Sequence, residues 1–299
     1  MSWFFFDHPF DTDHAGILSS FLYGVIGKDH WSLKVLSIAL ILYQAFQVNR
    51  LVSLNRLTRE NTLFPGLFYI LLVSLTGEFI PLLPVLLANT FVIILLMDVF
   101  KQTRNIELPM NMFNVGLWAG ISSLFYTPYL IYLGLGMFGV LYLRTYKWLD
   151  TLRAILGFVV PYFLLCTILF LNGQLHTFIP VHFGDVFALL DLRRVLTWQN
   201  YTVLAFYGMI ILMAVITSGT YNSGLNIHVR KKINVLFITM MGGLILIALV
   251  ANTGIDSLIF LALPLGVFMA AMFLELEKQF AEIIHFLLFI TALSFQYVL

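Results

Sequence analysis

The stretch AILGFVVPYFLLCTILFL, residues 154–171, carries no charged side chain over eighteen consecutive positions. An apolar run of this length predicts a helix that crosses a lipid bilayer, because a helix satisfies its own backbone hydrogen bonds where water is absent. Comparable runs follow one another from residue 31 to Leu299, with short polar connectors between them. The sequence therefore predicts an all-α fold, a polytopic bundle of transmembrane helices.

The composition agrees with a membrane location and excludes several other classes. Hydrophobic residues make up 61% of the 299 residues and charged residues 10%, whereas a soluble domain carries about 25% charged residues. The formal net charge of +1 gives no strong attraction for nucleic acid. Cys166 is the single cysteine, so a disulfide within the chain is excluded.

We expect two parts along the chain. Residues 1–30 form a non-cytoplasmic N-terminal segment with a short interfacial helix, and residues 31–299 form the transmembrane helical domain. The run 62–77 either crosses the membrane or enters it and returns as a hairpin with the next run. The apolar runs predict about ten spans, which are residues 31–48, 62–77, 81–99, 111–126, 129–143, 154–171, 201–218, 234–251, 258–274 and 283–298.

The basic residues predict the orientation of the bundle. With ten spans and Met1 on the periplasmic side, twelve of the sixteen Lys and Arg residues fall in cytoplasmic connectors. The four on the opposite side are Lys28, Lys34, Arg193 and Arg194. This asymmetry follows the positive-inside rule. It predicts a multi-pass protein of the bacterial inner membrane with both termini on the periplasmic side.

Few polar groups lie inside the predicted spans. Gly116 and Gly120 form a small-xxx-small pair, which predicts close helix packing. Asp98 lies near the end of one run, within helical reach of Lys101, and predicts an ion pair there. No Asp, Glu, Lys, Arg or His falls at the centre of any other predicted span. This disfavours a proton-coupled transporter, a voltage sensor and a charged ion pore.

Candidate site residues gather on the predicted periplasmic side. Asp11 and Asp13 belong to the stretch DHPFDTDH, residues 7–14, whose carboxylates and imidazoles suit a divalent metal or acid–base chemistry. Glu78 lies in a turn between apolar residues, where burial would make it a candidate general base. The alternative readings are a solvated N-terminus and a turn residue that faces water.

The longest predicted periplasmic connector, residues 172–200, contains His176, His182 and the adjacent pair Arg193-Arg194. Two adjacent guanidinium groups beside a membrane can hold a phosphate or pyrophosphate headgroup through bidentate hydrogen bonds. The alternative is an ordinary surface helix in which an arginine pairs with an aspartate. Arg193 and Arg194 are therefore candidate phosphate-binding residues.

Segments spread over about two thirds of the chain carry a resemblance to a known family. They are NRLTREN (residues 55–61), residues 89–100, NVGLWAGISSLFY (residues 114–126), residues 153–161, residues 264–276 and residues 282–297. Together they resemble an uncharacterised family of polytopic inner-membrane proteins of Bacteroidota. That family provides no activity to carry over, and the N-terminal Asp/His stretch is not part of the resemblance.

The middle of the chain is also loosely similar to membrane glycosyltransferases that use polyprenyl-phosphate sugar donors. That similarity implies that an acidic residue on the first outer loop acts as a base, near a bound divalent metal, and that outer arginines hold the lipid phosphate. In this sequence the acidic candidates are Asp7, Asp11, Asp13 and Glu78. The sequence departs from that superfamily because its acidic stretch precedes the first predicted span.

Three functions are compatible with these observations. The first is sugar transfer from a lipid carrier at the outer face, with Asp11, Asp13 and Glu78 as catalytic residues and a divalent metal as the candidate cofactor. The second is a non-catalytic scaffold or anchor subunit of an envelope membrane complex, and the third is a lipid transporter. The expected partners are membrane lipids, a polyprenyl-phosphate carrier and other envelope membrane proteins, and no nucleic acid. The sequence leaves open whether the protein is an enzyme.

Overall fold

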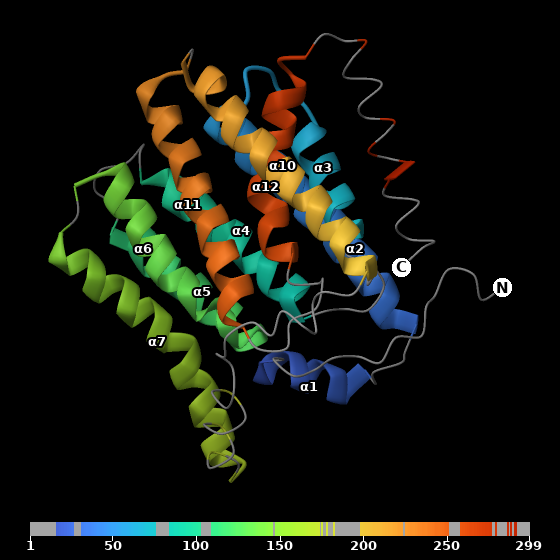
Figure 1. Ribbon diagram of the computed structural model, residues 1–299. Helices are drawn as coiled ribbons and strands as arrows, with labels where there is room; N and C mark the ends of the chain where they lie inside the picture. Colours follow the sequence, from blue (N-terminus) through green and yellow to red (C-terminus); the bar gives the residue numbers. More distant parts are fainter. Residues whose placement is uncertain are drawn as a thin grey trace. The chain divides into compact units, whose positions relative to one another are not determined.

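In the computed structural model of the protein, every regular element of the described residues is a helix (Figure 1). The structure describes residues 16–26, 31–75, 84–102, 109–145, 147–173, 198–223, 225–250 and 258–276, together with residues 175, 178, 182, 279, 286, 288, 290 and 291. The predicted all-α fold class is therefore confirmed for these residues.

The chain divides into two compact units, and the long helix α2 (Trp31–Asn55) begins in the first and ends in the second. Unit 1 consists of residues 1–40, 80–189 and 248–251. Unit 2 consists of residues 41–79, 190–247 and 252–299. Both units therefore combine segments that lie far apart in the sequence.

Unit 1 is built around helix α5 (Pro109–Phe125), which lies against every other helix that the structure describes wholly within this unit. Proline opens both α4 and α5, where its missing N–H removes no helical hydrogen bond. The other elements are α1 (Ile17–Ile26), α4 (Pro84–Lys101), the 3₁₀ helix η1 (Thr127–Leu130), α6 (Ile131–Leu143) and α7 (Trp148–Leu171).

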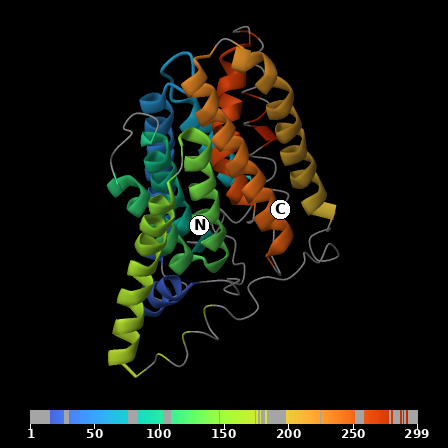
Figure 2. The same ribbon diagram turned by 90° about the vertical axis from the view of Figure 1, so that its left-hand side faces the viewer.

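Glycines bring the backbones of α5 and α7 into direct contact. A Cβ atom added at Gly116 would overlap the carbonyl of Ala154. One added at Gly157 would overlap the carbonyl of Phe113. Gly120 also faces α7, so the predicted small-xxx-small pair is confirmed as a packing surface. The two helices run in the same direction, and the last turns of α7 extend past the end of α5 (Figure 2).

Aromatic side chains and a buried hydrogen bond join α4 to the rest of unit 1. The ring of Phe91 stacks on Trp118, with centroids 6.0 Å apart, and on Phe125, with centroids 5.4 Å apart. The hydroxyl of Tyr129 in η1 donates to Asn89 Oδ1 at 2.6 Å. Burial of a tyrosine hydroxyl and an amide is tolerated because each satisfies the other.

Helix α12 (Ile259–Phe273) is the centre of unit 2 and is buried on all sides from Ile259 to Ala271. A helix that is apolar all round is typical of a core position. The ring of Phe273 lies 4.6 Å from that of Phe68, and the ring of Phe268 lies 4.2 Å from that of Phe237. The neighbouring helices are α3 (Phe64–Ser74), α10 (Trp198–Ser223) and α11 (Ile227–Leu249).

Hydrogen bonds made by buried side chains fix the helices of unit 2 against one another. The hydroxyl of Tyr69 in α3 donates to Gln44 Oε1 in α2 at 2.7 Å. The hydroxyl of Tyr207 in α10 donates to the carbonyl of Leu72 at 2.7 Å. The Gly66 N–H donates to Asn49 Oδ1 at 2.7 Å. These bonds replace the water that the buried groups have lost.

Four helices, α2, α4, α7 and α11, have the length and apolar composition needed to cross a membrane. The expectation of about ten spans is not confirmed, because other apolar runs of the described residues form shorter helices. Helix α3, in the predicted span 62–77, has 11 residues. At about 1.5 Å per residue it is about 16 Å long, against about 30 Å for the hydrocarbon layer. Hydropathy does not distinguish a short apolar helix of this kind from a membrane-spanning helix, because both are apolar.

Candidate functional site

Four polar side chains meet where α5 ends, beside α7. The Ser123 and Tyr162 hydroxyl oxygens are 2.9 Å apart, and the Tyr162 hydroxyl lies 3.1 Å from His182 Nε2. On the other side of the imidazole, Thr127 Oγ1 lies 3.3 Å from Nδ1. We call Ser123, Thr127, Tyr162 and His182 the Tyr162 cluster. Three elements supply it, namely α5, η1 and α7, together with the chain that follows α7.

One direction of donation satisfies these three contacts of the Tyr162 cluster. Ser123 donates its single proton to the carbonyl of Gly120 at 2.8 Å, so it accepts from Tyr162. Tyr162 then accepts from the N–H at Nε2 of His182, and Nδ1 accepts from Thr127. This pattern requires a neutral imidazole that carries its proton on Nε2.

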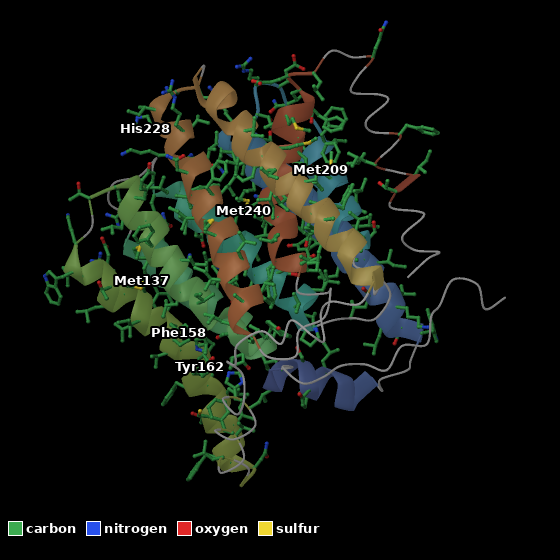
Figure 3. The ribbon with its side chains drawn as sticks, in the orientation of Figure 1. Met137, Phe158, Tyr162, Met209, His228 and Met240 are labelled. Carbon is green, nitrogen blue, oxygen red and sulfur yellow. The ribbon has the colours of Figure 1, made fainter. Side chains whose placement is uncertain are left out.

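Aromatic packing holds the chain after α7 against that helix. The ring of Phe178 stacks on His182, with centroids 5.3 Å apart and planes 16° apart. The Tyr162 ring meets His182 edge-on at 5.6 Å, and Phe158 lies one turn earlier on α7 (Figure 3). His182 is fully buried. Within the predicted connector 172–200, Phe178 and His182 therefore lie against α7 beside Tyr162.

Helix α1, from the N-terminal part of the chain, is hydrogen-bonded to the end of α5. The Gly16 N–H and the Ser19 hydroxyl both donate to the carbonyl of Phe125 at 2.8 Å. A side chain at Gly16 would overlap the carbonyl of Leu124, so the approach requires glycine. The N-terminal segment contains the short helix α1, which lies at the end of α5 (Figure 1).

Burial governs the electrostatics of the Tyr162 cluster. It lowers the pKa of His182 from 6.5 to about 4, because the charged imidazolium loses its hydration. At neutral pH the ring is therefore uncharged, in agreement with the direction of its hydrogen bonds. A neutral imidazole of such low basicity suits anchoring the connector better than accepting a proton from a substrate.

Acidification from pH 7 to pH 5 is expected to destabilise the protein through His182. The unfolded state binds the proton below about pH 6.5, but the folded state binds it only near pH 4, so stability is lost as the pH falls between these values. The loss at pH 5 is about 2 kcal/mol. Thermal melting in mild detergent at both pH values measures it, and His182→Gln should remove this part of the pH dependence. The exposed His228 (Figure 3) provides the control, because His228→Gln should leave it unchanged. An identical pH dependence in wild type and His182→Gln would contradict the assignment.

Two further carboxylates of unit 1 are buried, and each is paired with a basic side chain. Asp98 Oδ1 lies 2.6 Å from Lys101 Nζ, and Asp98 Oδ2 accepts from Trp118 Nε1 at 3.0 Å. The predicted ion pair at Asp98 is confirmed. Asp150 is 1% exposed and contacts two arginines. Because their oxygens are occupied by strong donors, neither aspartate is free for acid–base chemistry.

At the start of α7, basic groups surround the second of these carboxylates. Arg144 Nη2 lies 3.0 Å from Asp150 Oδ2, and Arg153 Nη1 lies 3.3 Å from Oδ1. The backbone N–H of Lys147 also donates to Oδ2 at 3.2 Å. We call Arg144, Lys147, Asp150 and Arg153 the Asp150 cluster. It fixes the beginning of α7 to the end of α6.

The candidate residues predicted from the sequence, Asp11, Asp13, Glu78, Arg193 and Arg194, all lie outside the described residues. Within the described part, no group of three or more His, Cys, Asp and Glu side chains could hold a metal ion.

Ser123, Thr127 and Tyr162 were missed as partners of His182. Isolated hydroxyls in apolar runs are common, and the three come from separate segments. The available signal was limited to Ser123 and Thr127, which lie near or just beyond the end of the predicted span 111–126, because Tyr162 lies at the middle of the run 154–171.

Comparison with known proteins provides a family and no activity. No curated protein sequence and no solved structure matches the chain. Residues 14–298 match the model of a family of unknown function (DUF6427). This match covers both units and every described helix, and the chain therefore belongs to that family.

Proposed function

We propose that the protein is an integral inner-membrane protein of the bacterial cell envelope that transfers a sugar from a polyprenyl-phosphate carrier at the periplasmic face. The observation that carries this proposal is the meeting of two chain segments at residues 123–127. Gly16 and Ser19 bind the carbonyl of Phe125, and His182 contacts Thr127 two residues later. The first segment follows the acidic stretch, and the second leads toward the arginine pair.

Covalent connectivity limits how far the candidate groups lie from this meeting point. Asp13 precedes Gly16 by three residues, so its Cα lies within about 11 Å of Gly16 Cα. Arg193 follows His182 by eleven residues, which allows at most about 40 Å. The length of the chain therefore keeps Asp13 close to Gly16, whereas it sets only a wide upper limit for Arg193.

The proposed transfer assigns a role to each group. An acceptor hydroxyl oxygen forms a bond to the anomeric carbon of the donor sugar, and its proton passes to Asp11, Asp13 or Glu78. The bond between the anomeric carbon and the phosphate oxygen breaks, and polyprenyl phosphate leaves with the electron pair. Arg193 and Arg194 stabilise the negative charge of that phosphate. The carboxylate oxygens of Asp11 and Asp13 are ligands that suit a divalent metal, which would screen charge at the same place.

Binding of the carrier tests the arginines directly. We expect Arg193→Gln/Arg194→Gln to weaken the binding of polyprenyl phosphate at least about tenfold, because charged hydrogen bonds to phosphate are worth about 1.5–3 kcal/mol. Native mass spectrometry of the protein in nanodiscs measures the binding. Arg230→Gln/Lys231→Gln removes the same charge from the predicted cytoplasmic side and is expected to change it less than twofold.

Release of polyprenyl phosphate from a labelled polyprenyl-phosphate hexose, with envelope glycan as acceptor, tests the chemistry. Asp11→Asn/Asp13→Asn/Glu78→Gln should abolish release while leaving carrier binding intact. Binding without release in the wild-type protein would favour the lipid transporter. Absence of both would favour the scaffold subunit, and either result would overturn the transferase.

A further inference from the structure

The Asp150 cluster carries more positive than negative charge. It contains three cations, Arg144, Lys147 and Arg153, and one carboxylate, that of Asp150, which leaves two net positive charges. The negative group is buried, with 1% of its side chain exposed, whereas the Arg153 side chain is 37% exposed and Lys147 is exposed. The surface at the start of α7 is therefore cationic.

The same cluster has more donors than acceptors. Asp150 offers two oxygens, and both are taken by the arginines and by the Lys147 N–H. The buried Nε of Arg144 has no acceptor within the described part of the chain. Arginine has five N–H donors in a planar fork, so most of those in the cluster are not used by Asp150. An oxyanion on this surface would meet donors and no exposed carboxylate of the cluster.

An exposed apolar stripe begins beside the cluster and runs along α7. Trp148, at the start of the helix, is 70% exposed, a position that suits an indole at the level of lipid headgroups. The stripe consists of Leu152, Leu156, Val159 and Phe163, which are 44%, 61%, 48% and 67% exposed. Their spacing places them on one face of the helix over about 16 Å.

Among the four long apolar helices, α7 is the least covered by the rest of the protein. Only 17% of its most apolar window is buried, against 44% for α2, 67% for α4 and 50% for α11. Apolar surface of this extent must be covered by hydrocarbon if the helix crosses a membrane. The cationic cluster and the apolar stripe are adjacent on one helix.

We propose that the start of α7 is a binding site for an anionic phospholipid. Its phosphate lies against Arg153 and Lys147, and its acyl chains lie along the stripe from Leu152 to Phe163. The charge of the cluster selects an anionic headgroup over a zwitterionic one, because basic residues near the membrane surface attract anionic lipid. The site is independent of the proposed transfer reaction, which involves other residues.

Quenching of Trp148 by brominated lipids tests the site. The full chain is placed in nanodiscs of phosphatidylcholine that contain brominated phosphatidylglycerol or brominated phosphatidylcholine. The quenching of Trp148 is the difference between the wild-type protein and Trp148→Phe. We expect the brominated phosphatidylglycerol to be favoured about thirtyfold over the zwitterionic lipid, which corresponds to about 2 kcal/mol for two basic residues.

Two matched double variants test which basic residues cause the preference for phosphatidylglycerol. Lys147→Gln/Arg153→Gln should reduce the preference for phosphatidylglycerol over phosphatidylcholine to a ratio of about one. Arg230→Gln/Lys231→Gln, which removes the same charge from α11, should preserve this preference. Thermal melting of each variant confirms that it is folded. Equal quenching by the two lipids in the wild-type protein would overturn the proposal. So would a preference that Lys147→Gln/Arg153→Gln does not change, or one that an excess of inorganic phosphate abolishes at constant ionic strength.

Discussion

Gly116→Leu is expected to separate α5 from α7 and to leave little folded protein. Even the first carbon of the new side chain would overlap the carbonyl of Ala154. Backbone atoms cannot rotate away as a side chain can, so the whole helix has to move. Overpacking a core usually costs about 1–3 kcal/mol, and we expect this backbone overlap to cost at least about 3 kcal/mol. Gly157→Leu, from the opposite helix, should have the same effect.

The control for this prediction is Gly134→Leu in α6. No atom lies within 4 Å of the position where its Cβ would be, and a leucine in a helix is intrinsically favoured over glycine. Size-exclusion chromatography and thermal melting in mild detergent measure the monodisperse folded fraction of each variant. If Gly116→Leu melted at the temperature of Gly134→Leu, the direct contact of α5 with α7 would be wrong.

Asp150→Asn is expected to destabilise the protein by about 3 kcal/mol, because removal of one partner leaves a buried charge without compensation. The buried charge that would lose its partner is that of Arg144, whose side chain is 15% exposed. Adding Arg144→Gln to Asp150→Asn should recover part of this loss, since the uncompensated charge is then absent. The free energy of unfolding in mild detergent, measured for both variants and the wild type, gives the two differences.

Glu275→Gln is the matched control for the loss of one carboxylate charge. Its ion pair with Arg59 has an N–O distance of 3.2 Å, but the two side chains are 26% and 53% exposed. Exposed pairs contribute about 0–1 kcal/mol, so this variant should stay close to the wild type. A loss as large as that of Asp150→Asn would show that burial is not what makes the Asp150 pair strong.

Interactions within one helix could be predicted from the sequence, and interactions between helices could not. The pair Asp98 and Lys101 was predicted because three residues bring side chains to the same helical face, and the two groups do meet. The contact of His182 with Tyr162 and Thr127 joins residues 20 and 55 positions apart. No local pattern specifies that distance, because the path of the connector depends on what it packs against.

The sequence by itself determined that the chain is helical and apolar enough for a bilayer, since hydropathy and the lack of charge are properties of each run. It also determined that Gly116 and Gly120 pack closely, although not that Ala154 and Phe158 of α7 lie opposite them. Only the tertiary structure decided which apolar runs became long helices and which became short ones such as α3 and α12. The physical reason is that a helix apolar on every side, like α12, has no polar face to indicate its neighbours, so its position follows from shape complementarity alone.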